Sequence, residues 1–291
     1  MGLDLDRRQR AMLQEMGVKV WWPEAAPAAA LEPVVEVAVA EAAVVPPSSV
    51  RAPATPAARP LPPAPAPAAA RERAPLQPRP AGLEQMDWPA LQASVAGCQA
   101  CKLCSGRKNT VFGVGRMPTA AEAGVDWLVV GEAPGENEDL QGEPFVGQAG
   151  KLLDNMLKAM GLARRGEGGP GVFITNVLKC RPPGNRNPES DEVTQCEPFL
   201  LRQIELLRPK IILAMGRFAV QSLLQGSVPD VQATPLGRLR GRVYRYHGVP
   251  VVVTYHPAYL LRSLPDKSKA WTDLCLALDV QQKTAQAAGA A

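Results

Sequence analysis

The amino-acid sequence predicts an α/β fold in which helices cover both faces of a mainly parallel sheet. From about Gly82 onward, short apolar segments alternate with stretches of helical periodicity, which is typical of strand–helix–strand units. The first 80 residues, in contrast, hold 15 of the 30 prolines and many of the alanines. About 210 residues therefore remain for one globular domain, which is ample to bury a core.

The expected strands and helices follow one another within residues 82–291. The strand candidates are short apolar runs at 126–131, 172–176, 211–215 and 249–254. The helix candidates lie between and after them, at 149–160, 190–208, 217–225 and 267–280. Strands that alternate with helices in this way pair in parallel, and the helices then lie on both faces of the sheet.

The amino-terminal region has no core of its own. Residues 23–81, rich in Pro and Ala, are expected to form a disordered linker. Residues 1–22 are expected to form a short amphipathic helix that docks onto a partner, a replication or repair protein. The alternative is that this segment packs back onto the domain at 82–291. Its apolar side consists of Met12, Leu13, Met16, Trp21 and Trp22.

Charge and hydropathy exclude some classes of protein. The formal net charge is +4 at pH 7, which is too small to establish nucleic-acid binding by itself. The chain has no apolar run of about 18 residues, and its first residues lack the basic and apolar regions of a secretory signal. We therefore expect a cytoplasmic monomer with no membrane partner.

The spacing of the cysteines predicts a metal centre rather than disulfides. Cys98 and Cys101 share one tight turn, and Cys180 and Cys196 supply a second pair of thiols. Four thiolates suit either zinc or an iron-sulfur cluster, and thiolate chemistry alone does not separate the two. Together with Cys104, Cys98 and Cys101 have the spacing that begins a ferredoxin ligand run, but the continuation of that run is missing. Cys104 is therefore expected to be a spare thiol. Cys275 lies among leucines and is expected in the core.

Three segments follow predicted strands and are expected to form the functional site, because ligands of such sheets bind beyond the carboxyl ends of the strands. In 131–150, glycines allow a flat ligand to approach the backbone, and Phe145 offers a stacking face. In 176–188, the Asn176 carboxamide offers a donor and an acceptor to a base edge. In 255–262, His256 precedes a proline.

Each of these features also has a simpler explanation. The alternative for the first loop is an acidic surface loop with one anchoring phenylalanine. Asn176 would then be a turn or helix cap, and His256 a structural histidine. The other histidine, His247, is expected in an ordinary turn.

Four motifs stand out in these segments: Gly-Glu-Ala-Pro-Gly at 131–135, Pro-Phe-Val-Gly-Gln-Ala-Gly at 144–150, Ile-Thr-Asn-Val-Leu-Lys-Cys-Arg-Pro-Pro at 174–183 and His-Pro-Ala-Tyr-Leu-Leu-Arg at 256–262. Taken together, they resemble the motifs of family 4 uracil-DNA glycosylases. The resemblance spans roughly residues 91–278. It implies a three-layer α/β/α sandwich around a four-stranded, mainly parallel sheet. It also implies hydrolysis of the N-glycosidic bond of uracil in DNA, which leaves an abasic site.

The resemblance also assigns the site residues. It implies a 4Fe-4S cluster on Cys98, Cys101, Cys180 and Cys196. For the uracil pocket it implies the backbone at Glu132 and Ala133, the ring of Phe145, the carboxamide of Asn176 and the imidazole of His256. His256 would stabilise the departing uracil anion, and Glu138 would position or activate the attacking water, supported by Glu132 and Asn185.

Two other classes of function compete with this interpretation. One is a noncatalytic iron-sulfur or zinc protein that binds nucleic acid on the same fold. The other is a small electron-transfer protein, which would require a ferredoxin-like ligand run and no His-Pro-Ala-Tyr segment.

Overall fold

The structure is a computed structural model that describes residues 78–117, 124–165 and 170–289. The predicted docking helix at 1–22 and nearly all of the predicted linker at 23–81 lie outside the described residues.

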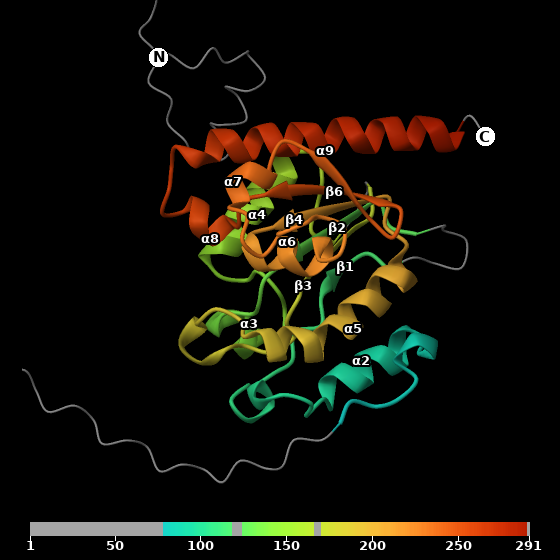
Figure 1. Cartoon of the computed structure of the whole chain (residues 1–291), viewed down its shortest axis with the longest axis vertical. Helices are drawn as coiled ribbons and strands as arrows, with labels where there is room; N and C mark the ends of the chain where they lie inside the picture. The colour runs from blue at the N-terminus through green and yellow to red at the C-terminus, as the bar shows by residue number, and fades with distance from the viewer. Residues whose placement is uncertain (1–77, 118–123, 166–169, 290–291) are drawn as a thin grey trace, which may run out of the picture. The chain divides into compact units, whose positions relative to one another are not determined.

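The centre of the described domain is a six-stranded sheet in the order β1-β3-β2-β4-β6-β5 (Figure 1). Its four inner strands are parallel, and every residue of β2, β3 and β4 is buried. These inner strands are β2 (Trp127–Gly131), β3 (Val172–Asn176), β4 (Ile211–Met215) and β6 (Val249–Thr254). All four strand predictions are thus confirmed, with the first beginning one residue later than expected.

The prediction of only four strands is corrected by two antiparallel edge strands. β1 (Val114–Gly115) pairs with β3, and β5 (Val243–Tyr246) pairs with β6. β1 has two residues, and β5 alternates exposed with half-buried positions, so neither produces the continuous apolar run of a buried strand. β5 joins β6 through a tight turn at His247 and Gly248, where both residues have positive φ, as a two-residue hairpin requires.

Helices cover both faces of the sheet and confirm the three-layer sandwich (Figure 1). On one face, Trp127 and Val129 of β2 pack with α4 (Gln148–Ala159) and α9 (Asp266–Gly289). On the other face, Leu128 and Val130 pack with α5 (Ser190–Leu207) and α6 (Arg217–Leu224). α9 extends beyond the predicted 267–280 in both directions.

The remaining elements are short. A third apolar cluster joins α2 (Trp88–Ala96) to α5 and includes Cys180 and Cys196. The other helices are η1 (Leu83–Gln85), η2 (Lys102–Ser105), α3 (Glu136–Gln141), η3 (Pro183–Asn185), α7 (Leu236–Leu239) and α8 (Pro257–Leu260). Within the described ranges, no helix is long and apolar enough to cross a membrane.

The sheet brings the three expected loops to one edge. Gly131 at the end of β2 pairs with Asn176 at the end of β3, and Met215 at the end of β4 pairs with Thr254 at the end of β6. The segments that leave these positions therefore meet beyond the same edge of the sheet.

Candidate active site

A cavity of about 740 Å³ lies at this edge. It is large enough for a flat heterocyclic group together with part of the larger molecule that carries this group. The seven non-cysteine residues that the sequence predicted for the site all line it: Glu132, Ala133, Glu138, Phe145, Asn176, Asn185 and His256.

Asn176 lines this cavity and carries an unsatisfied hydrogen-bond acceptor. The residue is 2% exposed, and its side-chain oxygen Oδ1 has no hydrogen-bond partner among the described residues. A buried polar atom without a partner costs free energy, so such an atom in a cavity wall points to a ligand that supplies the partner. Gly131 makes room for it, because a Cβ at Gly131 would lie 2.4 Å from Asn176 Oδ1.

Phe145 is held in an uncommon conformation beside the imidazole of His256. Its φ is 55°, a left-handed value that is rare for a bulky residue, and its side chain is buried. The two rings are stacked, with centroids 5.4 Å apart and planes inclined by 28°. Gly150 cannot carry a side chain, because its Cβ would lie 1.7 Å from the Phe145 carbonyl oxygen.

His256 caps α8, and this contact sets its protonation. Its Nδ1 accepts a hydrogen bond of 3.2 Å from the Ala258 backbone N–H, so the proton of the neutral imidazole lies on Nε2. Burial lowers the pKa of His256 to about 4; the nearby Glu138 carboxylate opposes this shift and Arg262 reinforces it. Near pH 7 the residue is therefore a neutral hydrogen-bond donor through Nε2.

Glu138 organises the loop that carries Phe145. Its Oε2 accepts a hydrogen bond from the Gly135 N–H, and its Oε1 accepts from the N–H groups of Val146 and Gly147 at 2.9 and 3.1 Å. The contact with Gly135 N–H caps the first turn of α3, and the contacts with Val146 and Gly147 fold the loop back onto this helix. The role of Glu138 in handling water stays a prediction, and the hydrogen bonds give this residue a structural task as well.

Glu132 and Asn185 differ in their environments. Burial raises the pKa of Glu132 to about 7, which places its titration near neutral pH. The Glu132 backbone carbonyl accepts a hydrogen bond from the Leu178 N–H and continues the pairing of β2 with β3. Asn185 is exposed at the end of η3, and its side-chain oxygen accepts a hydrogen bond of 2.7 Å from Arg181.

Part of the cavity wall was not predicted from the sequence. Gly216 and Arg217 follow the carboxyl end of β4 and line the cavity. Because ligands of such sheets bind beyond the carboxyl ends of the strands, these two residues could have been predicted in the same way as the other three segments. A Cβ at Gly216 would lie 3.0 Å from the Cβ of His256. Leu236 and Gly237 lie far from any strand end in sequence, and no local pattern identifies them.

The four predicted cysteine ligands surround a second, small cavity. Cys98 and Cys101 lie between α2 and η2, Cys180 follows β3, and Cys196 lies on α5. They form no disulfide with one another, and Cys104 does not line the cavity. Among the described residues, no three candidate ligand side chains are arranged to hold a single metal ion.

Hydrogen-bond donors face the two buried thiols. Arg107 Nη1 donates to the sulfur of Cys180 at 3.2 Å, and the Lys179 backbone N–H donates to that of Cys196 at 3.3 Å. Burial raises the pKa of the Cys180 thiol to about 11 and that of the Cys196 thiol to about 12. The contacts with Arg107 and Lys179 oppose this effect of burial and favour the thiolate, the form in which cysteine binds a metal centre.

The buried ammonium of Lys179 connects the two cavities. Its Nζ donates to the Asn176 backbone carbonyl at 2.6 Å and to the side-chain oxygens of Thr175 and Gln203, both at 2.7 Å. Lys179 also lines the cysteine cavity. The backbone of Asn176 is thereby fixed by a residue that contacts the cysteine site.

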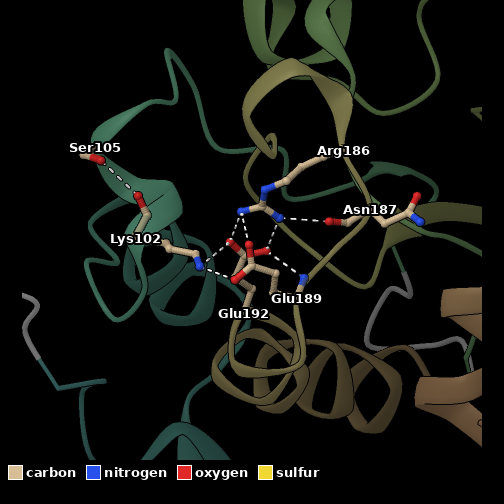
Figure 2. Close-up of polar contacts among 6 residues, drawn as sticks. All are labelled: Lys102, Ser105, Arg186, Asn187, Glu189 and Glu192. Atoms are coloured by element: carbon tan, nitrogen blue, oxygen red, sulfur yellow. Dashed lines mark hydrogen bonds and ion pairs between the residues drawn. The ribbon is translucent and has the colours of Figure 1, made fainter.

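A charged network also ties the cysteine-rich segment to the wall of the large cavity (Figure 2). The fully buried Glu192 carboxylate accepts two hydrogen bonds from Arg186, at 2.9 and 2.5 Å, and one from the Glu189 N–H. Lys102 of η2 forms an ion pair with Glu189. Since Arg186 and Asn187 line the large cavity, the network fixes this part of the wall.

Comparisons with known proteins identify relatives of this chain. Residues 118–276 match the family model described as the uracil DNA glycosylase superfamily. A type-4 uracil-DNA glycosylase of Saccharolobus solfataricus is 44% identical over 176 residues, which cover 59% of this chain and 76% of the relative. That of Pyrobaculum aerophilum is 42% identical over 195 residues, or 66% and 93%. That of Thermotoga maritima is 41% identical over 172 residues, or 58% and 80%.

Proposed function

The chain belongs to the type-4 uracil-DNA glycosylases, and from this premise we propose how its residues remove uracil from DNA. It is a hydrolytic glycosylase of DNA repair, and its substrate is uracil-containing DNA. The target nucleotide leaves the base stack and its base enters the large cavity, as glycosylases require.

The unpartnered Oδ1 of Asn176 is the observation that carries the proposal. This oxygen accepts a hydrogen bond from uracil N3–H, while the amide nitrogen of the same group donates to uracil O4. Cytosine presents an acceptor at N3 and an amino group at C4, so both contacts would be lost. A site built to hydrogen-bond one edge rejects an analogue that leaves its buried polar groups unpaired.

Phe145 and His256 act on the bound base from different directions. The Phe145 ring stacks on the uracil plane, while His256 Nε2–H donates to uracil O2. Cleavage of the glycosidic bond leaves negative charge on the uracil ring, so the donor binds the transition state more strongly than the ground state. One fixed donor of this kind lowers the activation free energy by about 3 kcal/mol.

Water completes the reaction. The sequence indicated Glu138 as the group that positions or activates water, but three backbone N–H groups already occupy its carboxylate. The Glu132 carboxylate, with a pKa of about 7, is ionised in part at neutral pH and suits the general base that takes a proton from the attacking water. Glu138 and Asn185 help to position this water from the same cavity. The residues that line the cavity in the described part of the chain include no lysine, so water attacks C1′ and the DNA strand stays intact.

Cys98, Cys101, Cys180 and Cys196 are proposed to hold a 4Fe-4S cluster. Each iron of such a cluster takes one cysteine sulfur, so the four sulfurs surround a cavity rather than a single point, as the four thiols do here. The cluster, when bound, links the segment before β2 to β3 and α5, and the hydrolysis itself moves no electrons. Protein purified without oxygen should contain about four irons per chain, and stoichiometric zinc would contradict the assignment.

The base specificity can be tested with one panel of substrates. We expect the full chain to release uracil from U:G and U:A pairs, so that alkali then cleaves the strand at an abasic site. T:G pairs should remain intact. Binding of uracil-containing DNA without release of the base would instead support the noncatalytic nucleic-acid-binding protein.

We also propose roles for the regions beyond the site. Residues 82–291 form the glycosylase domain, and the protein acts as a monomer in the cytoplasm. Residues 1–22 serve as a segment that docks onto a replication or repair protein, and 23–81 tether this segment to the domain. Deletion of residues 1–80 should leave the excision of uracil from short oligonucleotides unchanged, because all assigned residues lie beyond position 80. A folded truncated protein without activity would place the amino-terminal segment in the active structure.

A further inference from the structure

We propose that Arg164, oriented by Asp154, is a positioning residue that fixes the Phe145 ring against the base. This inference rests on the stacking role proposed above for Phe145. Arg164 lies in the segment after α4 and outside every motif that indicated the site, and it does not line the cavity. Any effect on the base must therefore pass through the loop that it holds.

The loop needs such support because of the conformation of Phe145. A φ of 55° is unfavourable for an L residue with a large side chain and persists only where the surroundings enforce it. In this conformation the buried ring stacks beside His256. A loop free to relax would return Phe145 to negative φ and turn its ring away.

Opposite charges hold the peptide unit between Phe145 and Val146 at both ends. On the carbonyl side, Arg164 Nη2 donates to the Phe145 oxygen at 2.7 Å, and Nη1 donates to the Pro144 oxygen at 2.8 Å. On the amide side, Val146 N–H donates to Glu138 Oε1 at 2.9 Å. Two parallel bonds from one planar guanidinium fix two successive carbonyl groups, which a lysine ammonium cannot do with the same geometry.

Asp154 on α4 sets the orientation of this guanidinium. Its Oδ1 lies 2.8 Å from both Nε and Nη2 of Arg164 and so holds one edge of the guanidinium, while Nη1 and Nη2 reach the loop carbonyls. Arg164 is 17% exposed, so its contacts are largely shielded from water, whereas the Asp154 carboxylate is 48% exposed. The pair thus connects the rigid helix α4 to the strained residue of the loop.

The neighbouring Arg165 provides a matched control. Its guanidinium pairs with Glu143 in the same loop at 3.1 Å, but the two side chains are 61% and 42% exposed. Exposed ion pairs of this kind contribute little to the stability of a fold. Arg165→Ala therefore removes the same charge from the same segment without releasing the Phe145 carbonyl.

The test measures single-turnover excision of uracil and inhibition by free uracil. Arg164→Ala should slow excision by about 10-fold or more and weaken inhibition by uracil similarly, while Arg165→Ala stays within about 2-fold of the parent. Arg164→Lys should recover only part of the rate. In a Phe145→Ala background, Arg164→Ala should cause almost no further loss, because both changes remove the same stacked ring.

The outcomes separate this inference from the proposed function. If Phe145→Ala excises uracil at the parental rate, the stacking role itself is wrong. If Phe145→Ala is slow but Arg164→Ala retains the parental rate and uracil inhibition, or if the two effects multiply, the role of Arg164 is overturned. Should Arg164→Ala fail to fold, Asp154→Asn replaces it in the test. The proposal expects Asp154→Asn to lower the single-turnover rate of uracil excision by about 3-fold, and this loss should disappear in the Phe145→Ala background.

Discussion

Substitution of His256 by alanine removes a donor that acts only as the glycosidic bond breaks. Since burial lowers the pKa of His256 to about 4, the imidazole is neutral near pH 7 and Nε2 carries the proton. Loss of one fixed donor to a developing anion costs about 3 kcal/mol, which is roughly a 100-fold fall in rate. Affinity for uracil-containing DNA should change little, because the donor acts in the chemical step.

The capping role of His256 requires a second variant. His256→Ala also removes the hydrogen bond from Ala258 N–H that begins α8, which costs about 1 kcal/mol of stability. Asparagine is a good cap, so His256→Asn should restore the stability while its shorter side chain leaves excision slow. Single-turnover rates and thermal unfolding of both variants separate the two roles.

Two results would refute this reasoning about His256. One is a parental rate of excision in both variants. The other is a limb near pH 6.5 in the parental pH–rate profile that disappears in His256→Ala. Such a limb would mean that the imidazolium, rather than the neutral imidazole, is the active donor.

Three further predictions concern other parts of the site. Asn176→Ala should lower uracil excision by about 100-fold or more and abolish inhibition by free uracil, because the N3 and O4 edge of the base loses its hydrogen-bond partner. Unchanged inhibition would exclude Asn176 as that partner. Excision should rise with pH through about 7 as Glu132 ionises, and this limb in kcat/KM should vanish in Glu132→Gln; a limb retained in the variant belongs to another group. Cys180→Ser should lose iron and Cys104→Ser should retain it, as measured by metal analysis; iron loss in both would make Cys104 a ligand.

The sequence predicted the elements that depend on local, strongly apolar patterns. The four inner strands are such elements, because both of their faces are buried and the residues read as continuous apolar runs. The edge strands β1 and β5 were missed because they bury little and owe their conformation to their neighbours. The candidate site residues could be proposed because they follow strand ends and lie in motifs that resemble those of a known family, and the structure places them around one cavity.

The supporting contacts of the site could not be predicted in the same way. The hydrogen bonds of Glu138 to Val146 and Gly147, and those of Arg164 to the Phe145 carbonyl, join side chains to backbone groups. Any polar residue can make such contacts, so residue type and spacing carry no signal for them. The left-handed φ of Phe145 is likewise a consequence of the folded surroundings, since the residue type disfavours it.

A crystal structure of the full chain with free uracil tests the central claim most directly. The account predicts uracil in the large cavity, stacked on Phe145, with its N3 about 2.9 Å from Asn176 Oδ1 and its O2 within hydrogen-bond distance of His256 Nε2. Uracil bound elsewhere, or bound in the cavity with Asn176 Oδ1 still lacking a partner, would contradict it.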